Sequence, residues 1–256
     1  MERPSLMVAN WKMYKTIHAA RAFGVELLRR MEEDPGPRGL TQVLCPTALA
    51  LAPLAERLRG SAIRVGAQNL DLGVEGPRTG ALSAYLLRDA GAEYVIVGHS
   101  ERRQEFAEDD DLVAAKVVEA LKGQLTPIVC VGETRDERDH GLTETVVTRQ
   151  IERVLSAVTP DREVVFAYEP VWAIGSGRTP TASEAEQVAQ LMRNLIGRSW
   201  PGTDALVRVL YGGSVNRDSI RTFAEHTSFD GVLVGGASLD VDHWLDINRR
   251  WGEVRC

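Results

Sequence analysis

The sequence predicts an α/β protein built as a single (β/α)8 barrel, in which a closed parallel sheet is surrounded by helices. Short apolar runs recur along the 256 residues, and each leads into Gly, Pro, Asn or a polar loop. Segments with helical hydrophobic periodicity separate these runs. Because no linker or low-complexity tract divides the chain, we expect one catalytic domain over residues 1–256.

Each expected strand is a short run of apolar and largely β-branched residues. In chain order the strands are Leu6–Ala9, Gln42–Cys45, Ile63–Ala67, Tyr94–Val97, Pro127–Val131, Val164–Ala167, Val207–Tyr211 and Val232–Val234. The helices expected between them include His18–Met31, Asp111–Leu121, Glu144–Val158 and Ser183–Ile196. Thr181 and Glu184 have the spacing of a capping box, which predicts the start of the last of these helices.

The alternation of strands and helices requires a parallel sheet, either closed into a barrel or left open. An open sheet that binds a dinucleotide usually carries G-x-G-x-x-G after its first strand. Here the first strand is followed by Asn10-Trp11-Lys12-Met13, which cannot form that loop. Eight units in about 250 residues fit the closed barrel, so the active site is expected at the carboxyl ends of the strands.

Composition excludes several classes of function. A net charge of −6 without a basic run argues against nucleic-acid binding, and no segment has the length and apolarity of a membrane span or the pattern of a signal peptide. The three cysteines, Cys45, Cys130 and Cys256, are sparse and lack metal-binding spacing, which favours a reducing, cytoplasmic location. No cofactor or metal motif is present, and we expect neither.

The stretch 167–177 is the most informative part of the chain. Glu169 stands where the strand Val164–Ala167 ends, and Pro170 then prevents further pairing. The apolar loop that follows contains two glycines and is suited to a movable flap. A carboxylate in this position fits a general base whose pKa is raised by desolvation. The alternative is a strand-end glutamate paired with a lysine or arginine.

Two further strand ends carry residues that suit proton transfer. Gly98 permits a tight turn after the fourth strand and places His99 at or near a helix N-terminus. Because the helix dipole disfavours imidazolium, we expect a neutral His99 that can donate to a substrate carbonyl. Asn10 and Lys12 end the first strand, where a lysine can face an anionic substrate. The alternatives are a structural histidine and a solvated surface lysine.

Glycine pairs at 212–213 and 235–236 follow the last two strands. Each pair precedes an expected helix start, where free N–H groups can bind a phosphate, although either alone fits a plain turn. On this fold a phosphate commonly binds after strands seven and eight. Cys130 is interpreted as a buried apolar residue, because no histidine lies near it in sequence. The set indicates proton abstraction next to a carbonyl of a phosphorylated substrate.

Five motifs, in order and spread over essentially the whole chain, resemble the triosephosphate isomerase family. They are Asn10-Trp11-Lys12-Met13, Gly98-His99-Ser100-Glu101-Arg102-Arg103, Ala167-Tyr168-Glu169-Pro170-Val171-Trp172-Ala173-Ile174-Gly175, Tyr211-Gly212-Gly213-Ser214-Val215 and Leu233-Val234-Gly235-Gly236-Ala237-Ser238. The resemblance implies a TIM-barrel isomerase that interconverts dihydroxyacetone phosphate and D-glyceraldehyde 3-phosphate without a cofactor. That reaction belongs to glycolysis and gluconeogenesis.

The resemblance also implies a role for each site residue. Glu169 would move a proton between adjacent carbons of the substrate through an enediolate, whose oxygens His99 would polarise. Lys12 and Asn10 would provide charge and orientation, and Glu101 would support Lys12. The backbone N–H groups that would hold the phosphate are those of Gly175, Ser214, Gly235 and Gly236.

The chain departs from the family's pattern in the loop that joins the two subunits of a dimer. At 76–81 it reads Gly-Pro-Arg-Thr-Gly-Ala, so Arg78 replaces an aromatic residue that plugs into the partner. Ala81 replaces a glutamate that pairs across the interface, whereas Thr79 is kept. We expect a homodimer joined through residues 73–82, with a contact surface unlike that of the family.

Two more departures concern the surroundings of the site. Tyr14 replaces the usual small or polar residue after the Lys-Met pair. Pro180 stands in the flap hinge, at a position whose N–H in the family donates to the tyrosine that matches Tyr211, and proline has no N–H. Two alternatives stay open: an isomerase of a four-carbon ketose phosphate, and a non-catalytic barrel that binds sugar phosphates.

Overall fold

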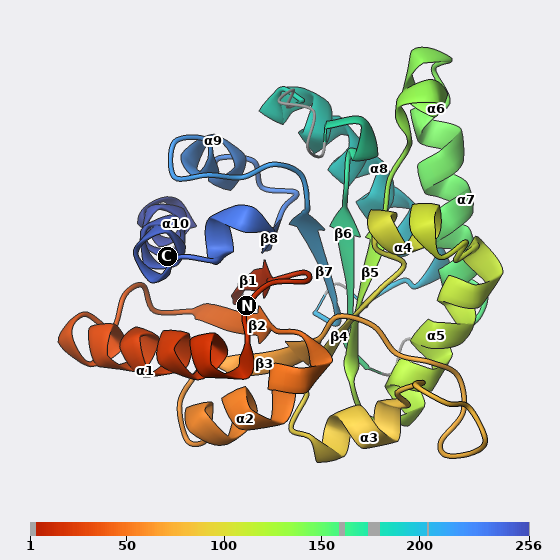
Figure 1. Ribbon diagram of the computed structural model, residues 1–256. Helices are drawn as coiled ribbons and strands as arrows, with labels where there is room; N and C mark the ends of the chain where they lie inside the picture. Colours follow the sequence, from red (N-terminus) through yellow and green to blue (C-terminus); the bar gives the residue numbers. More distant parts are fainter. Residues whose placement is uncertain (1–3, 159–161, 174–179, 204, 256) are drawn as a thin grey trace.

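The sheet closes into an eight-stranded parallel barrel. The computed structural model describes residues 4–158, 162–173, 180–203 and 205–255. The strands pair in chain order and β1 pairs with β8, while the helices surround them (Figure 1). The strands are β1 (Ser5–Asn10), β2 (Leu40–Cys45), β3 (Arg64–Ala67), β4 (Tyr94–Val97), β5 (Thr126–Val131), β6 (Val164–Tyr168), β7 (Val207–Tyr211) and β8 (Gly231–Val234).

Helices occupy the connections between strands, and α10 follows the last strand. They are α1 (Ile17–Glu33), α2 (Ala48–Leu58), α3 (Ala84–Asp89), α4 (Ser100–Glu105), α5 (Asp110–Lys122), α6 (Arg135–Asp139), α7 (Thr143–Leu155), α8 (Ala182–Ser199), α9 (Ile220–Ala224) and α10 (Val241–Arg255), with 3-10 turns η1 (Val171–Ala173) and η2 (Gly236–Ser238). Across the ranges that the structure describes, no helix combines the length and apolarity needed to cross a membrane.

Barrel closure depends on a glycine. Gly231 at the start of β8 lies opposite Leu6 of β1. A Cβ atom at position 231 would lie 1.8 Å from the Leu6 carbonyl oxygen, so any side chain there would force the two strands apart. The seam between the first and last strands therefore requires glycine.

Strand alternation divides the core into two layers. Leu6 and Val8 belong to the buried cluster inside the barrel, whereas Met7 and Ala9 belong to the layer between strands and helices. Val165 and Ala167 also face inward. Two residues further along each strand, the same alternation directs Asn10 and Glu169 toward the mouth of the barrel. The alternation of side chains along the strands thus explains why Asn10 and Glu169 both lie at the mouth of the barrel.

The sequence-based prediction of the barrel is confirmed. All eight strands occur within about two residues of their expected bounds. Helices α1, α5 and α8 cover three of the segments predicted to be helical, and α7 matches the fourth but ends at Leu155, three residues before its expected end. The capping box of α8 is present, with Thr181 Oγ1 accepting from Glu184 N at 3.2 Å and Glu184 Oε2 accepting from Thr181 N at 2.8 Å.

Candidate active site

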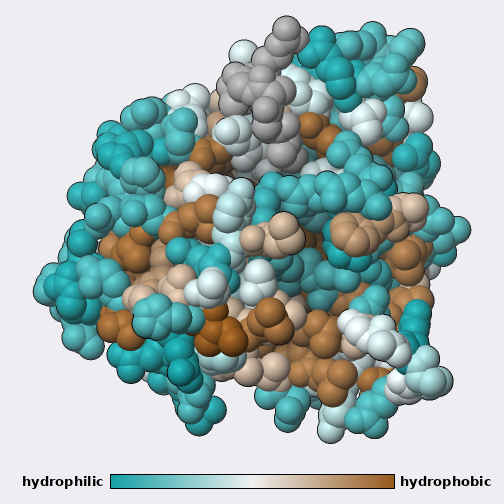
Figure 2. Space-filling model, in the orientation of Figure 1, coloured by the Kyte–Doolittle hydropathy of each residue, from teal (hydrophilic) through white to brown (hydrophobic). Residues whose placement is uncertain are grey.

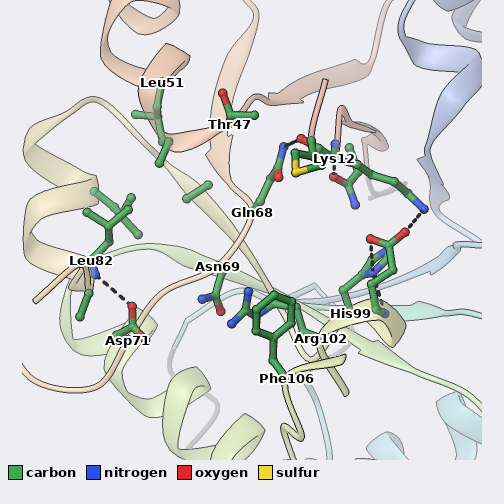
Figure 3. Close-up of a pocket in the computed structure, with 18 of the residues that line it drawn as sticks. Lys12, Thr47, Leu51, Gln68, Asn69, Asp71, Leu82, His99, Arg102 and Phe106 are labelled. Carbon is green, nitrogen blue, oxygen red and sulfur yellow. Dashed lines mark hydrogen bonds and ion pairs between the residues drawn. The ribbon is translucent and has the colours of Figure 1, made fainter. Parts of the chain in front are cut away.

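The carboxyl ends of β1, β4 and β6 bring Lys12, His99 and Glu169 together. Lys12 and His99 line a cleft of about 880 Å³ at the mouth of the barrel, which extends to Leu82 and Phe106 (Figure 3). Glu169 lies behind His99 and is only 2% exposed. The expected proximity of these side chains is therefore present, with the carboxylate withdrawn from the cleft.

Lys12 is held in an unusual backbone conformation. Its φ is +50°, in the left-handed region that residues other than glycine seldom adopt. The Asn10 side chain accepts from Lys12 N at 3.0 Å, and Gln68 Nε2 donates to the Lys12 carbonyl at 2.8 Å. Lys12 Nζ lies 2.6 Å from Glu101 Oε1, which orients the ammonium group beside His99 (Figure 3). Asn10, Gln68 and Glu101 thus fix both ends of the lysine.

His99 and Glu169 form a buried pair. His99 is the N-cap of α4, and its Nδ1 accepts from Glu101 N at 3.2 Å. That bond assigns the ring proton to Nε2, which lies 3.0 Å from Glu169 Oε1. The other carboxylate oxygen, Oε2, accepts from Ser100 N at 3.0 Å. The position of Glu169 is thereby fixed by two contacts from the turn between β4 and α4.

The directions of the pKa shifts differ from those expected from sequence. Burial raises the pKa of Glu169, but the adjacent His99 and the Ser100 N–H outweigh burial and leave this pKa below its ordinary value. Burial lowers the pKa of His99, but the effect of the Glu169 carboxylate is larger than that of burial, so the pKa of His99 is raised. The predictions of a raised pKa for Glu169 and a lowered one for His99 are wrong for this arrangement. They treated the two groups separately, whereas the fold places them in contact.

Replacing the carboxylate should reverse the shift at its neighbour. In Glu169→Gln the pKa of His99 should fall, because burial and Lys12, which both lower it, are then opposed only by the Glu101 carboxylate. An NMR titration of the His99 ring measures this. Glu93→Gln, which removes a carboxylate at the opposite end of β4, is the matched control and should leave the titration unchanged. An unaltered His99 pKa in Glu169→Gln would contradict the pairing.

Glycines give the side chains of Glu169 and Lys12 room. A Cβ at Gly212 would lie 2.9 Å from Glu169 Cγ, and one at Gly235 would lie 3.3 Å from Lys12 Cε. The backbone N–H groups of Ser214, Gly235 and Gly236 donate to no acceptor within the described part of the chain. These N–H groups are available to an anion at the ends of β7 and β8. The predicted flap begins with η1 (Val171–Ala173), whereas Gly175, the fourth predicted phosphate-binding residue, and the remainder of the flap up to 179 lie outside the described residues.

Glu133 is a site residue that the sequence reasoning missed. Its side chain is fully buried at the end of β5 and accepts from Tyr168 Oη at 3.2 Å and Trp172 Nε1 at 2.9 Å. These bonds tie the segment on either side of Glu169 to the neighbouring strand. The sequence does carry a signal for it, since Glu133 follows the fifth expected strand as Glu169 follows the sixth. Cys130 is fully buried, as predicted, and burial and the Glu169 carboxylate raise the pKa of its thiol.

The Tyr211 hydroxyl is buried without a hydrogen-bond partner in the part of the chain that the structure describes. Its ring stacks on Phe223 with centroids 3.9 Å apart, and a Cβ at Gly213 would lie 2.2 Å from the hydroxyl oxygen. An unpaired buried hydroxyl destabilises the fold by about 1–3 kcal/mol relative to an apolar group of the same shape. The ring itself accounts for the packing.

Tyr211→Phe should therefore unfold at the same or a higher temperature, because it removes only the unpaired oxygen. We expect kcat to change well under tenfold, since Pro180 supplies no N–H that the hydroxyl could bind. Thermal unfolding and steady-state kinetics test this, with Phe223→Leu as a control that should lower stability by loss of stacking. A large drop in kcat for Tyr211→Phe would show that the hydroxyl acquires a partner during turnover.

The fold and the site together define a class: a (β/α)8-barrel enzyme with a histidine–carboxylate pair and a lysine at the mouth of the barrel. A sequence model described as triosephosphate isomerase matches residues 5–250. Among similar proteins named triosephosphate isomerase, that of Roseiflexus castenholzii is 45% identical over 96% of both chains. Those of Carboxydothermus hydrogenoformans and Aquifex aeolicus are 42% and 40% identical, over 96% and 94% of this chain and 98% and 97% of theirs. The chain belongs to the triosephosphate isomerase family, and it is an isomerase.

Proposed function

We propose that the protein interconverts dihydroxyacetone phosphate and D-glyceraldehyde 3-phosphate by proton transfer through an enediolate. The observation that carries this proposal is the contact of Glu169 Oε1 with His99 Nε2 at 3.0 Å, beside Lys12. A carboxylate can take a proton from a carbon next to a carbonyl when a neighbouring donor stabilises the charge that develops on oxygen. The exchange is internal to the substrate, so we expect no cofactor.

The proposed division of labour follows from the positions of the groups. Lys12 and His99 line the cleft and are placed to face the two substrate oxygens, where negative charge increases as the enediolate forms. Asn10, also in the cleft lining, orients Lys12. The phosphate would bind the N–H groups of Ser214, Gly235 and Gly236, which donate to no acceptor within the described ranges.

Glu169 must leave its present contacts to act as the base. Both of its oxygens are engaged, one by His99 and one by Ser100 N. Movement toward the cleft would release His99 Nε2 to donate to substrate. It would also weaken the main charge that raises the pKa of His99, which favours a neutral imidazole as donor when substrate is bound. The neutral His99 expected from sequence is thus proposed for the substrate complex.

The decisive assay compares substrates. With no cofactor added, kcat/KM for D-glyceraldehyde 3-phosphate should exceed that for four-carbon ketose phosphates by a large factor, because the site must fit the whole phosphorylated substrate. A preference for a four-carbon substrate would identify a sister isomerase. Binding of triose phosphate without turnover would identify a sugar-phosphate-binding barrel and would overturn the proposal.

We also propose a homodimer joined through residues 73–82. The part of this loop before Thr79 would enter the cleft of the partner copy, because residues 79–82 line the cleft of their own copy. The cleft is lined by Tyr14 and Phe106, which are 58% and 60% exposed, although large apolar groups are usually covered. Figure 2 shows hydrophobic side chains gathered in the lower part of this face, over the region of α2 and α3. Three exposed hydrophobic residues line the cleft, namely Met13, Tyr14 and Phe106, and three more lie on α2 and α3, namely Leu49, Tyr85 and Leu86.

The substitution at Arg78 should give this dimer a charge-dependent contact. Arg78 Nη1 donates to the Leu72 carbonyl of its own loop at 2.5 Å, and the cleft of a second copy offers Glu105 together with Phe106. Sedimentation at micromolar concentration should show a dimer whose dissociation rises with salt, and the salt dependence should weaken in Arg78→Tyr. A clean monomer would exclude the dimer, and unchanged salt dependence in Arg78→Tyr would remove Arg78 from its interface.

Three broader proposals accompany the activity. Residues 1–256 act as one catalytic barrel domain. The protein works in the cytoplasm, which is supported by Cys45 and Cys130 being buried free thiols. Its reaction serves glycolysis and gluconeogenesis, through sugar phosphates and without nucleic-acid or membrane partners.

A further inference from the structure

The turn that carries His99 is held from behind by a guanidinium group. Arg103 Nε donates to the Gly98 carbonyl at 2.8 Å, and its Nη2 donates to the Cys130 carbonyl at 3.3 Å. Gly98 immediately precedes His99, and Cys130 lies near the end of β5. The Arg103 side chain is 15% exposed and does not line the cleft. It therefore joins the end of β4 to the end of β5 without being placed to touch a substrate.

These two carbonyls need a donor because the ladder between β4 and β5 ends before them. Its last pair is Val97 with Val129, and Gly98, at φ +67°, then turns the chain away. The Val131 carbonyl accepts from Glu169 N, just after β6, so the adjacent Cys130 carbonyl points the other way, toward β4. Arg103 supplies the hydrogen bond that β4 no longer provides, and a buried carbonyl rarely stays unpaired.

Arg103 is itself fixed on its far side. Its Nη1 lies 2.6 Å from Asp110 Oδ1 at the start of α5, and the other oxygen of Asp110 accepts from Arg149 Nε at 2.8 Å. A Cβ at Gly98 would lie 2.9 Å from Val113 of α5 and 3.1 Å from Arg103 Nη2. The turn, the guanidinium and α5 are packed together, which leaves the His99 turn little freedom to shift.

We propose that Arg103 is a positioning residue that sets the placement of His99 relative to Glu169 and the substrate. One anchor is the peptide that precedes His99, and the other lies on β5, whose neighbour β6 leads into Glu169. A misplacement of about 1 Å between catalytic groups can lower a rate 100-fold, so greater freedom of the His99 turn should lower kcat. This inference rests on the proposed function, because it concerns a reaction that uses both groups.

The test compares Arg103→Leu with Arg149→Leu. Both variants remove one cationic partner of Asp110, but only the first removes the donors to the strand carbonyls. Arg103→Leu should lower kcat by roughly 10- to 100-fold with KM changed less than about threefold, whereas Arg149→Leu should keep both values. Arg103→Lys retains a charge but not the planar fork that reaches three acceptors, and it should recover only part of kcat.

Two additional measurements separate positioning from mere structural support. Affinity for a planar enediolate mimic should fall in Arg103→Leu in proportion to kcat, and guanidinium at millimolar concentration should partly restore kcat to Arg103→Ala. Folded Arg103→Leu with wild-type kcat, or an equal loss in Arg149→Leu, would overturn the proposal. If Arg103→Leu does not fold, Arg103→Lys carries the same comparison.

The inference can fail separately from the proposed function. If the wild-type protein does not isomerise triose phosphate, the proposed function is wrong, yet the placement of His99 can still be measured. The NMR signals and pKa of the His99 ring should change in Arg103→Leu and stay as in wild type in Arg149→Leu. Identical His99 signals in the two variants would overturn the positioning role whatever the substrate.

Discussion

Glu169→Gln should slow turnover by roughly 10²–10⁴-fold, with only a modest change in substrate affinity. The amide has the size of the carboxylate and can still accept from Ser100 N, so the fold should be kept, but it cannot take a proton from carbon. Steady-state kinetics on D-glyceraldehyde 3-phosphate measure the loss. Retention of most of kcat would rule out Glu169 as the base.

Two further variants define what the loss means. Glu169→Asp keeps a carboxylate but withdraws it by about 1 Å, which should still cost about 100-fold because proton transfer depends on position. Glu93→Gln removes a carboxylate of 40% exposure that pairs with Arg64 at the opposite end of the barrel, and it should leave kcat unchanged. A similar loss in Glu93→Gln would attribute the effect to overall charge instead of to the site.

Lys12→Met should lower kcat/KM by roughly 10²–10³-fold, because it removes the ammonium group that we propose faces the enediolate oxygens. The net charge of the protein is −6, so no general attraction for a phosphorylated substrate replaces it. Competitive inhibition by a phosphoglycolate-type mimic should weaken in parallel. Inhibition constants measured for both proteins test this directly.

The control for Lys12 is a lysine outside the site. Lys122→Met removes an ammonium group that is 68% exposed and pairs with Glu119 on α5, and inhibition should not change. Lys12→Arg keeps the charge on a longer planar group and should recover part of the affinity. Unchanged inhibition in Lys12→Met would place Lys12 outside the substrate's reach, despite its position in the cleft.

The strands were predictable because their signals are local. Each is a short apolar run that ends at a polar or glycine-containing segment, and alternation then fixes which residues face the barrel interior. Because the carboxyl ends of parallel strands lie on one face of the barrel, the strand positions predict that Lys12, His99 and Glu169 lie close together. The sequence did not predict α2, because Pro53 interrupts the expected helical pattern. A proline inside the helix is tolerated because buried leucines pack the helix against the core.

The electrostatics of the site could not be derived from local sequence. The directions of the pKa shifts of His99 and Glu169 depend on a contact between residues at the ends of different strands. The local sequence around each residue predicts the opposite direction for each pKa. Glu133 and Arg103 were missed for a related reason. Each side chain acts through a contact with a neighbouring strand end, and the sequence alone does not show which strand end a side chain contacts.

The proposed mechanism is isomerisation by proton transfer through Glu169. The most direct test is to run the reaction in deuterium oxide and examine the product by NMR. A proton held on a carboxylate exchanges with solvent, so we expect deuterium on the carbon that receives the proton. Glu169→Gln should form almost no product. Product that retains only protium at that carbon would indicate direct hydride transfer between the two carbons and would contradict the account.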